Sequence, residues 1–142
     1  MLQQDKPDDY IIGTGESHSV RGFVELAFEY AGIEIEWKGN WVNKKGVTCS
    51  LASHLISTLK VGDILIEINS HYFCPTEVAY LLADPSKARD KMGWKPRITL
   101  KELVRIMVDF DIESIGISST GEGKKIILDK RLHWIKNQYE GK

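Results

Sequence analysis

The stretch HYFCPTEVAYLLADPSKARDKMGWKP, residues 71–96, is the most informative part of the sequence for the fold. Its first residues close an apolar run, and Pro75 then interrupts any strand, because proline cannot donate to a sheet ladder. The same proline suits the first turn of a short helix, from whose start Glu77 would project. Farther along, Asp84 is placed to cap a second helix that ends at Gly93. The stretch therefore predicts the end of a strand, one exposed carboxylate and a new helix.

Three apolar runs outside this stretch predict short strands. DYIIGTG (residues 9–15) is typical of a buried parallel strand that ends in glycine. IEIEWKG (33–39) alternates apolar and charged residues, as half-buried strands do. DILIEIN (63–69) places its isoleucines on one face, and we expect this strand to close near Tyr72. The first strand would need partners on both edges, and three such strands do not close a sheet by themselves.

Helical periodicity is clearest in two places. One helix has Ser19 as its N-cap and stops at Gly32. The other begins with a capping box of Thr99 and Glu102. The second helix has an apolar stripe that consists of Leu100, Leu103, Val104, Met107 and Val108.

Two segments are less regular. Residues 39–60 show no clear period and predict a long loop with one short helix, which is uncommon in a compact domain unless the loop is functional. Residues 121–142 predict a basic amphipathic helix. Such a helix could touch a membrane surface or nucleic acid, but we favour the plainer interpretation that it packs on its own domain. The elements together predict an α/β fold with few short strands.

The composition is that of an ordinary globular protein. The 142 residues carry a net charge of −1, which gives no electrostatic argument for a nucleic-acid or membrane partner. The N-terminus MLQQDKPDDY lacks the features of a signal peptide, and no run approaches about 18 apolar residues. Cys49 and Cys74 lie far apart, and the four histidines show no metal-ligand spacing. We therefore expect a reduced, cytoplasmic protein without a metal site.

Three stretches carry a family resemblance, namely DYIIGTGESHSVRGFVELAF (9–28), IEIEWKG (33–39) and YFCPTEVAYLLADPSKARDKMGWKPRITLKELVRIMV (72–108). They resemble the C-terminal part of the GDP-mannose 4,6-dehydratases, which belong to the extended short-chain dehydrogenases, and the resemblance covers residues 1–113. It implies a Rossmann-type fold in which an N-terminal domain holds NADP and the catalytic Thr, Glu, Tyr and Lys. A smaller C-terminal region covers the sugar nucleotide. The implied reaction converts GDP-mannose to GDP-4-keto-6-deoxymannose, towards GDP-fucose.

The catalytic and cofactor motifs of that family are not found in this sequence. No glycine-rich dinucleotide turn opens a helix after a strand, and no tyrosine is followed four residues on by lysine. The chain therefore resembles the substrate-binding portion with the N-terminal dinucleotide domain absent, so we expect no catalytic residue and no cofactor site in it. Met1 is expected to be an internal methionine that serves as a start. Whether such a chain is an enzyme stays open.

The resemblance assigns roles by position. Glu77 matches the carboxylate that binds the ribose hydroxyls, since a carboxylate accepts two hydrogen bonds from a vicinal diol. Cys74 falls where the family has an arginine that clamps the diphosphate, and a thiol cannot replace that planar fork. This loss should weaken binding by roughly 1.5–3 kcal/mol, about ten- to a hundredfold. Arg21 is expected to meet either a phosphate or a neighbouring carboxylate.

Two functions remain as alternatives. The chain is either the sugar-nucleotide-binding part of a dehydratase, truncated or split and inactive by itself, or a non-catalytic interaction module or decayed remnant of that enzyme. The expected partners are GDP-mannose and a Rossmann-domain chain or intact dehydratase subunit. In both cases residues 1–113 are expected to form the substrate-binding region and residues 114–142 a basic helical tail.

Overall fold

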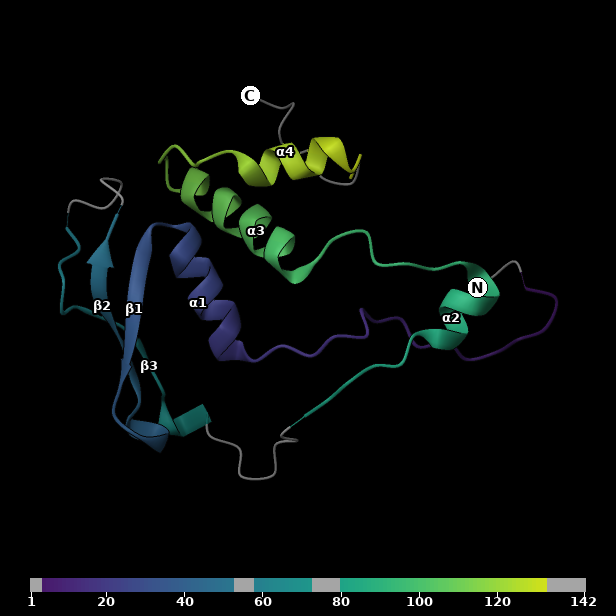
Figure 1. Ribbon diagram of the computed structural model, residues 1–142, viewed down its shortest axis with the longest axis horizontal. Helices are drawn as coiled ribbons and strands as arrows, with labels where there is room; N and C mark the ends of the chain where they lie inside the picture. Colours follow the sequence, from purple (N-terminus) through teal and green to yellow (C-terminus); the bar gives the residue numbers. More distant parts are fainter. Residues whose placement is uncertain (1–3, 53–57, 73–79, 133–142) are drawn as a thin grey trace.

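The computed structural model describes residues 4–52, 58–72 and 80–132 and shows a mixed arrangement of helices and strands (Figure 1). In chain order the elements are α1 (Val20–Tyr30), β1 (Ile33–Lys38), the 3-10 helix η1 (Trp41–Asn43), β2 (Lys45–Leu51), β3 (Ile64–Glu67), the 3-10 helix η2 (Ser70–Tyr72), α2 (Ser86–Met92), α3 (Leu100–Ser114) and α4 (Glu122–Asp129).

The three strands form one antiparallel sheet in the order β1-β2-β3. In β1 the apolar residues alternate with more exposed charged residues, which confirms the predicted half-buried strand. β2 lies within residues 39–60, where we expected a long loop with one short helix. The short helix is present as η1, but the loop prediction is wrong over β2. The hydrophobic pattern of the sequence does not indicate this strand, because its buried positions hold Gly46 and Thr48 rather than large apolar residues. A Cβ at Gly46 would lie 3.2 Å from the Cβ of Ile66, so the small residue lets β3 approach closely.

Two strand boundaries differ from the prediction. β3 ends at Glu67, and Tyr72 lies in η2 rather than at the end of a strand. Residues 9–15 form no strand, although their sequence is typical of one. A strand exists only where a neighbour completes its ladder, and β1, β2 and β3 pair only with one another in the described part of the chain.

The predicted helix boundaries depend on local chemistry, and the structure confirms all but one of the following. Ser19 accepts a hydrogen bond from the backbone N–H of Gly22 at the start of α1. Thr99 and Glu102 form the expected capping box at the start of α3. Asp84 accepts from the N–H of Ser86, but the N-cap of α2 is Pro85, so the predicted cap at Asp84 is wrong by one residue. Gly93 ends α2 with a φ of 65°, a left-handed conformation that favours glycine.

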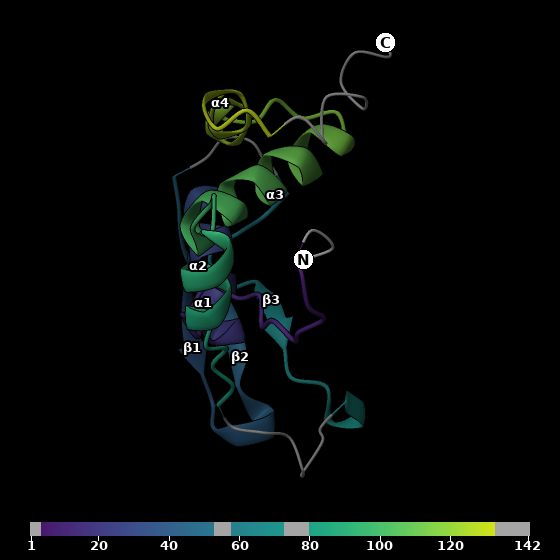
Figure 2. The same ribbon diagram turned by 90° about the vertical axis from the view of Figure 1, so that its right-hand side faces the viewer.

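The α3 helix packs on two sides. It contacts both α1 and α4, so its buried residues do not form one stripe (Figure 2). Val104 is buried as predicted, whereas Met107 is 42% exposed. Ile106 lies outside the predicted stripe but is buried with Leu132 in a small core under α4, where the partly buried residues are Ile98, Ile126 and Ile127.

The basic tail is a shorter helix than expected within the described residues. The α4 helix covers Glu122–Asp129, and the rest of the predicted helix from residue 133 onward lies outside the described residues. A Cβ on Gly123 would come within 2.6 Å of the backbone oxygen of Arg105. Only glycine therefore allows α4 to lie this close to α3.

Figure 1 shows α2 at one end of the molecule together with the described N-terminal residues, away from the sheet and the other helices. Extended segments connect this end to the rest. Asp8 pairs with Lys87 and Lys91 of α2, and the ammonium of Lys87 lies 5.2 Å from the ring centre of Tyr10. These contacts fasten the N-terminal residues to α2.

Candidate functional site

Two of the predicted ligand-binding residues, Cys74 and Glu77, lie at 73–79, outside the described residues. The described chain on either side is η2 before them and an extended segment from Tyr80 onward. Their roles stay predictions from the resemblance.

Arg21 lies in the first turn of α1 and meets a neighbouring carboxylate. Its Nε donates to Oε1 of Glu25 at 2.9 Å, and its guanidinium carbon lies 5.1 Å from the ring centre of Trp37. Trp37 also donates to Glu25, at 2.7 Å. The bonds from Arg21 and then Trp37 hold the pKa of Glu25 below its usual value. Of the two contacts expected for Arg21, the carboxylate is the one present, and a phosphate contact stays a prediction.

The motif TGESHS before α1 is ordered by its own side chains. The hydroxyl of Thr14 accepts from the N–H of Glu16 at 3.2 Å, and a carboxylate oxygen of Glu16 lies 3.1 Å from Nε2 of His18. With the Ser19 cap, these short-range bonds lead the chain directly into α1.

The two longest resembling stretches meet at a junction formed by residues 13–15 and 83–85. Gly13 lies so close to Ala83 that a Cβ on the glycine would be 2.5 Å from the alanine Cβ. The ring of Pro85 lies 3.7 Å from the equivalent position on Gly15. The pair of Asp8 with Lys87, farther along the same segments, holds the pKa of Asp8 below its usual value. The structure thus brings together the segment that leads into α1 and the segment that follows Glu77.

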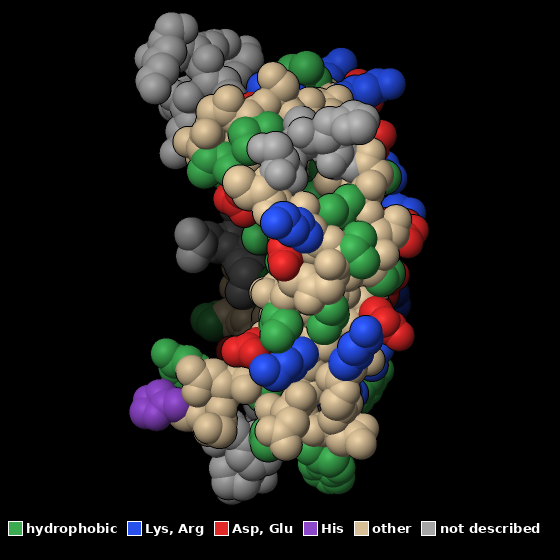
Figure 3. Space-filling model, turned by 90° about the vertical axis from the view of Figure 1, so that its left-hand side faces the viewer, with side chains coloured by type: hydrophobic (Ala, Val, Ile, Leu, Met, Phe, Trp, Pro, Cys, Tyr) green, Lys and Arg blue, Asp and Glu red, His purple; other side chains and the backbone are tan. Residues whose placement is uncertain are grey.

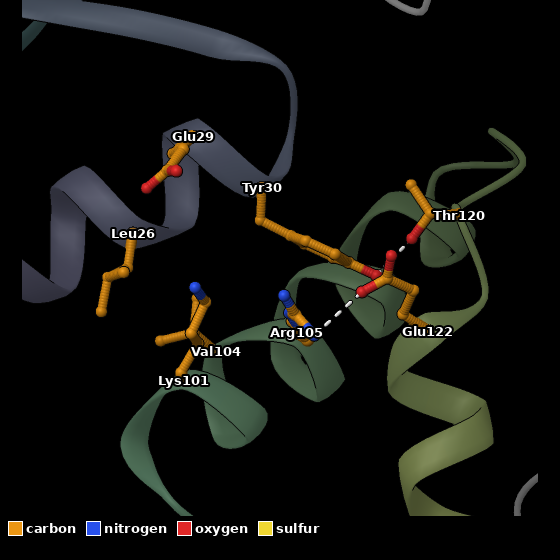
Figure 4. Close-up of a pocket in the computed structure, with 8 residues that line it drawn as sticks. All are labelled: Leu26, Glu29, Tyr30, Lys101, Val104, Arg105, Thr120 and Glu122. Atoms are coloured by element: carbon orange, nitrogen blue, oxygen red, sulfur yellow. Dashed lines mark hydrogen bonds and ion pairs between the residues drawn. The ribbon is translucent and has the colours of Figure 1, made fainter.

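A pocket of about 250 Å³ lies between α1, α3 and the start of α4 (Figure 4). Figure 4 shows that α1 contributes one wall, α3 the floor and the residues before and in α4 the far side. The lining residues are Leu26, Glu29, Tyr30, Lys101, Val104, Arg105, Thr120 and Glu122.

The charges of this pocket balance. Two carboxylates, Glu29 and Glu122, face two cations, Lys101 and Arg105, and Arg105 pairs with Glu122 at 3.0 Å. A nucleoside diphosphate needs an excess of positive charge, and pockets for drug-sized ligands usually start at about 300 Å³. The pocket is therefore unsuited to a sugar nucleotide.

Beside the pocket lies a buried carboxylate, Asp109, which sequence reasoning missed. Tyr30 donates to its Oδ1 at 2.9 Å, and the N–H of Gly123 donates to its Oδ2 at 2.7 Å. The Thr120 hydroxyl lies next to both Tyr30 and Asp109. Burial, and then the hydrogen bond to Asp109 and the negative charge of that group, raise the pKa of Tyr30. The sequence marks Asp109 only as an acidic residue three positions after Ile106, so on the same side of a helix. That spacing does not by itself indicate a buried carboxylate.

Ion pairs complete the attachment of α4 to α3. Lys124 pairs with Glu113 at 2.7 Å, and Lys130 pairs with Glu102 at 2.6 Å. The bond from Lys130, and then the backbone N–H of Thr99, hold the pKa of Glu102 below its usual value. These two ion pairs connect α3 to residues 124–130 of the basic tail.

Replacing Glu102 by glutamine is expected to reduce the acid sensitivity of folding. A carboxyl group with a lowered folded-state pKa stabilises the fold above its unfolded-state pKa, and this contribution is lost as the pH falls through the folded-state pKa. Glutamine can still serve in the capping box with Thr99, but it carries no charge to lose. Urea unfolding at about pH 6 and about pH 3 should show a smaller loss of stability in E102Q than in the unchanged chain. Equal losses in the two proteins would contradict this role.

Neither metal-binding clusters nor membrane-spanning helices are found in the described parts of the chain. Within residues 4–52, 58–72 and 80–132, no group of three or more His, Cys, Asp or Glu could hold a metal ion. None of the described helices is long and apolar enough to cross a bilayer. On the face in Figure 3, Lys and Arg side chains are interspersed with Asp and Glu, so that face has no large patch of one sign.

Comparison with known proteins agrees with the resembling stretches. A family model described as GDP-mannose 4,6 dehydratase matches residues 1–107. Over 113 residues the chain is 42% identical to a GDP-mannose 4,6-dehydratase of Vibrio cholerae, 45% identical to that of Drosophila melanogaster and 42% identical to that of Homo sapiens. Each alignment covers 80% of this chain but only 30%, 26% and 28% of the respective relative. The chain thus spans less than a third of the length of these relatives, and by this match it belongs to the GDP-mannose 4,6-dehydratase family.

Proposed function

We propose that the chain is the sugar-nucleotide-binding part of a GDP-mannose 4,6-dehydratase and that it binds GDP-mannose with reduced affinity. The observation that carries this proposal is the 42% identity to the Vibrio cholerae dehydratase over 113 residues. In this proposal Glu77 binds the ribose hydroxyls, Arg21 binds a phosphate, and Cys74 leaves the second phosphate contact unmade.

The junction of residues 13–15 and 83–85 supports this proposal. Arg21 lies in the first turn of the helix that follows one side of the junction, and Glu77 precedes the other side by a few residues in the sequence. The Arg21 side chain is 51% exposed. An exposed pair such as that of Arg21 with Glu25 contributes only about 0–1 kcal/mol, so a phosphate can compete for the guanidinium.

NADP, which the family uses, does not fit the residues of this chain. The sequence has no G-x-G-x-x-G turn. The glycines of the GTG at residues 13–15 pack against Ala83 and Pro85 instead of leaving room for a pyrophosphate. We therefore propose that the cofactor and the catalytic residues are supplied from outside these 142 residues, and that these residues are inactive by themselves.

We assign residues 1–113 to the substrate-binding region and residues 114–142 to a basic segment added to it. The relatives align with 113 residues, and α4 lies in the added segment. We also propose the cytoplasm as its location, on the sequence argument from two separated cysteines.

A thermal melt of the purified chain with and without GDP-mannose tests the proposal. A ligand at 100 times its dissociation constant should add about 2.7 kcal/mol of stability, worth several degrees in a domain of this size. Glu77→Gln should abolish the shift, because it replaces one of the two acceptor oxygens by an amide donor and removes the charge that strengthens both hydrogen bonds to the ribose diol. The control is Glu67→Gln, which removes an exposed carboxylate of β3 that pairs with Lys45 of β2. This variant should leave the shift in melting temperature unchanged. No shift with the unchanged chain would refute the proposal.

A further inference from the structure

The pocket between α1, α3 and the start of α4 does not include Arg21, the one described residue that was assigned to the sugar nucleotide. Two of its lining residues, Thr120 and Glu122, lie beyond residues 1–107, which the family model matches. The family match therefore assigns no ligand to the complete pocket. A function of this pocket would be additional to the proposed binding of GDP-mannose.

Four charged side chains line the pocket, and only two of them pair with each other. Arg105 of α3 and Glu122 of α4 form an ion pair at 3.0 Å. Neither the carboxylate of Glu29 nor the ammonium of Lys101 has an ion-pair or hydrogen-bond partner among the described residues. One carboxylate on α1 and one ammonium on α3 are thus available to a ligand (Figure 4).

The two cations of the pocket project from the same side of α3. Lys101 and Arg105 lie four positions apart in this helix, a spacing at which like charges repel each other. Figure 4 shows nitrogen atoms of both side chains on the side of α3 that faces α1. Glu122 compensates the charge of Arg105, whereas no described residue compensates that of Lys101. An anionic group bound between the two cations would relieve their repulsion.

The guanidinium of Arg105 is held in position by its surroundings. Its carbon lies 5.8 Å from the ring centre of Tyr30, which is a cation–π contact. The Tyr30 hydroxyl in turn donates to the buried Asp109 at 2.9 Å. Glu122 is the only ion-pair partner of Arg105 among the described residues, so further N–H donors of the guanidinium are free. Arginine can bind a carboxylate with two parallel hydrogen bonds.

We propose that this pocket binds a small zwitterion of the amino-acid class. The carboxylate of the ligand lies between Lys101 and Arg105, its ammonium faces Glu29, and its aliphatic part lies against Leu26 and Val104. The pocket volume of about 250 Å³ is below the roughly 300 Å³ at which sites for drug-sized ligands begin, so a small metabolite has the appropriate size.

A zwitterion fits the unpaired charges better than a simple ion does. An anion without an ammonium would satisfy Lys101 but would bring a second negative charge towards Glu29. A cation without a carboxylate would satisfy Glu29 but would approach Lys101 and Arg105. A ligand with one charge of each sign leaves no charge of the pocket uncompensated.

The test is an NMR titration of the isotope-labelled chain with glycine, β-alanine, γ-aminobutyrate and ε-aminocaproate at low salt. These probes differ in the distance between ammonium and carboxylate. At least one should bind with a dissociation constant on the order of 1 mM, because exposed charges give weak, salt-screened binding. The amide signals of Glu29, Lys101, Arg105 and Glu122 should shift. No binding by any of the four probes would overturn the proposal.

Two control ligands each lack one charge of the best probe. The carboxylic acid and the amine of the same chain length should both bind about fivefold more weakly than the zwitterion, since each leaves one charge of the pocket unpaired. Binding of either control as tightly as the zwitterion would overturn the assignment of the ligand class.

Substitutions locate the site. Lys101→Met and Glu29→Gln should each weaken binding of the best probe about fivefold, whereas Lys101→Arg keeps the charge and should bind like the unchanged chain. The matched controls are Lys125→Met in α4 and Glu34→Gln in β1, which remove exposed charges outside the pocket and should not change binding. Equal effects of pocket and control variants would contradict the proposal.

A melt with GDP-mannose separates this site from the proposed sugar-nucleotide site. Lys101→Met should leave the effect of GDP-mannose on the melting temperature unchanged, because Lys101 belongs only to the zwitterion pocket. Loss of both ligands in this variant would contradict two independent sites. Circular dichroism of each variant checks that it folds.

Discussion

Asp109→Ala is expected to lower the free energy of unfolding by about 3 kcal/mol and the melting temperature by roughly 10 °C. Asp109 is 2% exposed and accepts hydrogen bonds from the Tyr30 hydroxyl and the Gly123 backbone. Alanine leaves the Gly123 N–H without an acceptor in a buried place and leaves the Tyr30 hydroxyl with Thr120 alone. A buried donor without an acceptor costs about 1–3 kcal/mol. The loss should detach α4 from α3 and loosen α1, because these bonds join all three helices. Urea and thermal unfolding measure the effect.

Two variants bracket this expectation. Asp109→Asn keeps one carbonyl acceptor and should cost less than alanine, since only part of the network is lost. Asp111→Ala removes an exposed carboxylate two residues along the same helix and should change stability by less than about 0.5 kcal/mol. If D109A and D111A were equally stable, the three-helix junction would have no energetic role.

Cys74→Arg is expected to tighten the binding of GDP-mannose about ten- to a hundredfold. By the resemblance, position 74 is that of an arginine whose guanidinium clamps the diphosphate with two parallel hydrogen bonds. Restoring this side chain should return roughly 1.5–3 kcal/mol of binding free energy. Titration calorimetry with GDP-mannose on the unchanged chain and on C74R measures the difference.

The chain offers a matched control for this substitution. Cys49 is an exposed cysteine in β2, so Cys49→Arg adds the same charge at an exposed position of a strand. C49R should bind GDP-mannose as weakly as the unchanged chain. Equal tightening by both substitutions would indicate a general effect of added charge rather than a specific phosphate ligand, and no tightening by C74R would contradict the role of position 74.

Features that depend on a few neighbouring residues could be predicted from the sequence. The cap at Ser19, the capping box of Thr99 and Glu102 and the glycine stop at Gly93 all involve residues within four positions of one another. Such contacts form in the same way in almost any tertiary setting. The strand β1 was equally readable because its alternation is strict.

Features that depend on distant residues could not be predicted. β2 was missed because Gly46 and Thr48 are buried for close strand approach and for a hydrogen bond to Asp63, not for hydrophobicity. Residues 9–15 lack a partner strand in the described chain, which no local pattern reveals. Asp109 is buried because Tyr30 and α4 pack over it. The helical periodicity of α3 shows only a charged residue on the same side of the helix as apolar ones.

For the site, the resemblance gave information that periodicity could not. It assigned roles to Arg21, Cys74 and Glu77, and of these only Arg21 lies in the described residues, paired with Glu25. The junction of residues 13–15 with 83–85 was not foreseen, because it joins segments about 70 residues apart and depends on small residues fitting against each other.

The bond between Tyr30 and Asp109 also has a consequence for the order of folding, because it joins residues 79 positions apart. The sheet and the α3–α4 pair are built from elements that follow one another along the chain, so their contacts close short loops. Closing a long loop costs more entropy, and contacts between distant residues form slowly. We therefore expect the strand meander and the α3–α4 pair to form early in refolding, and the docking of α1 onto α3 to set the rate.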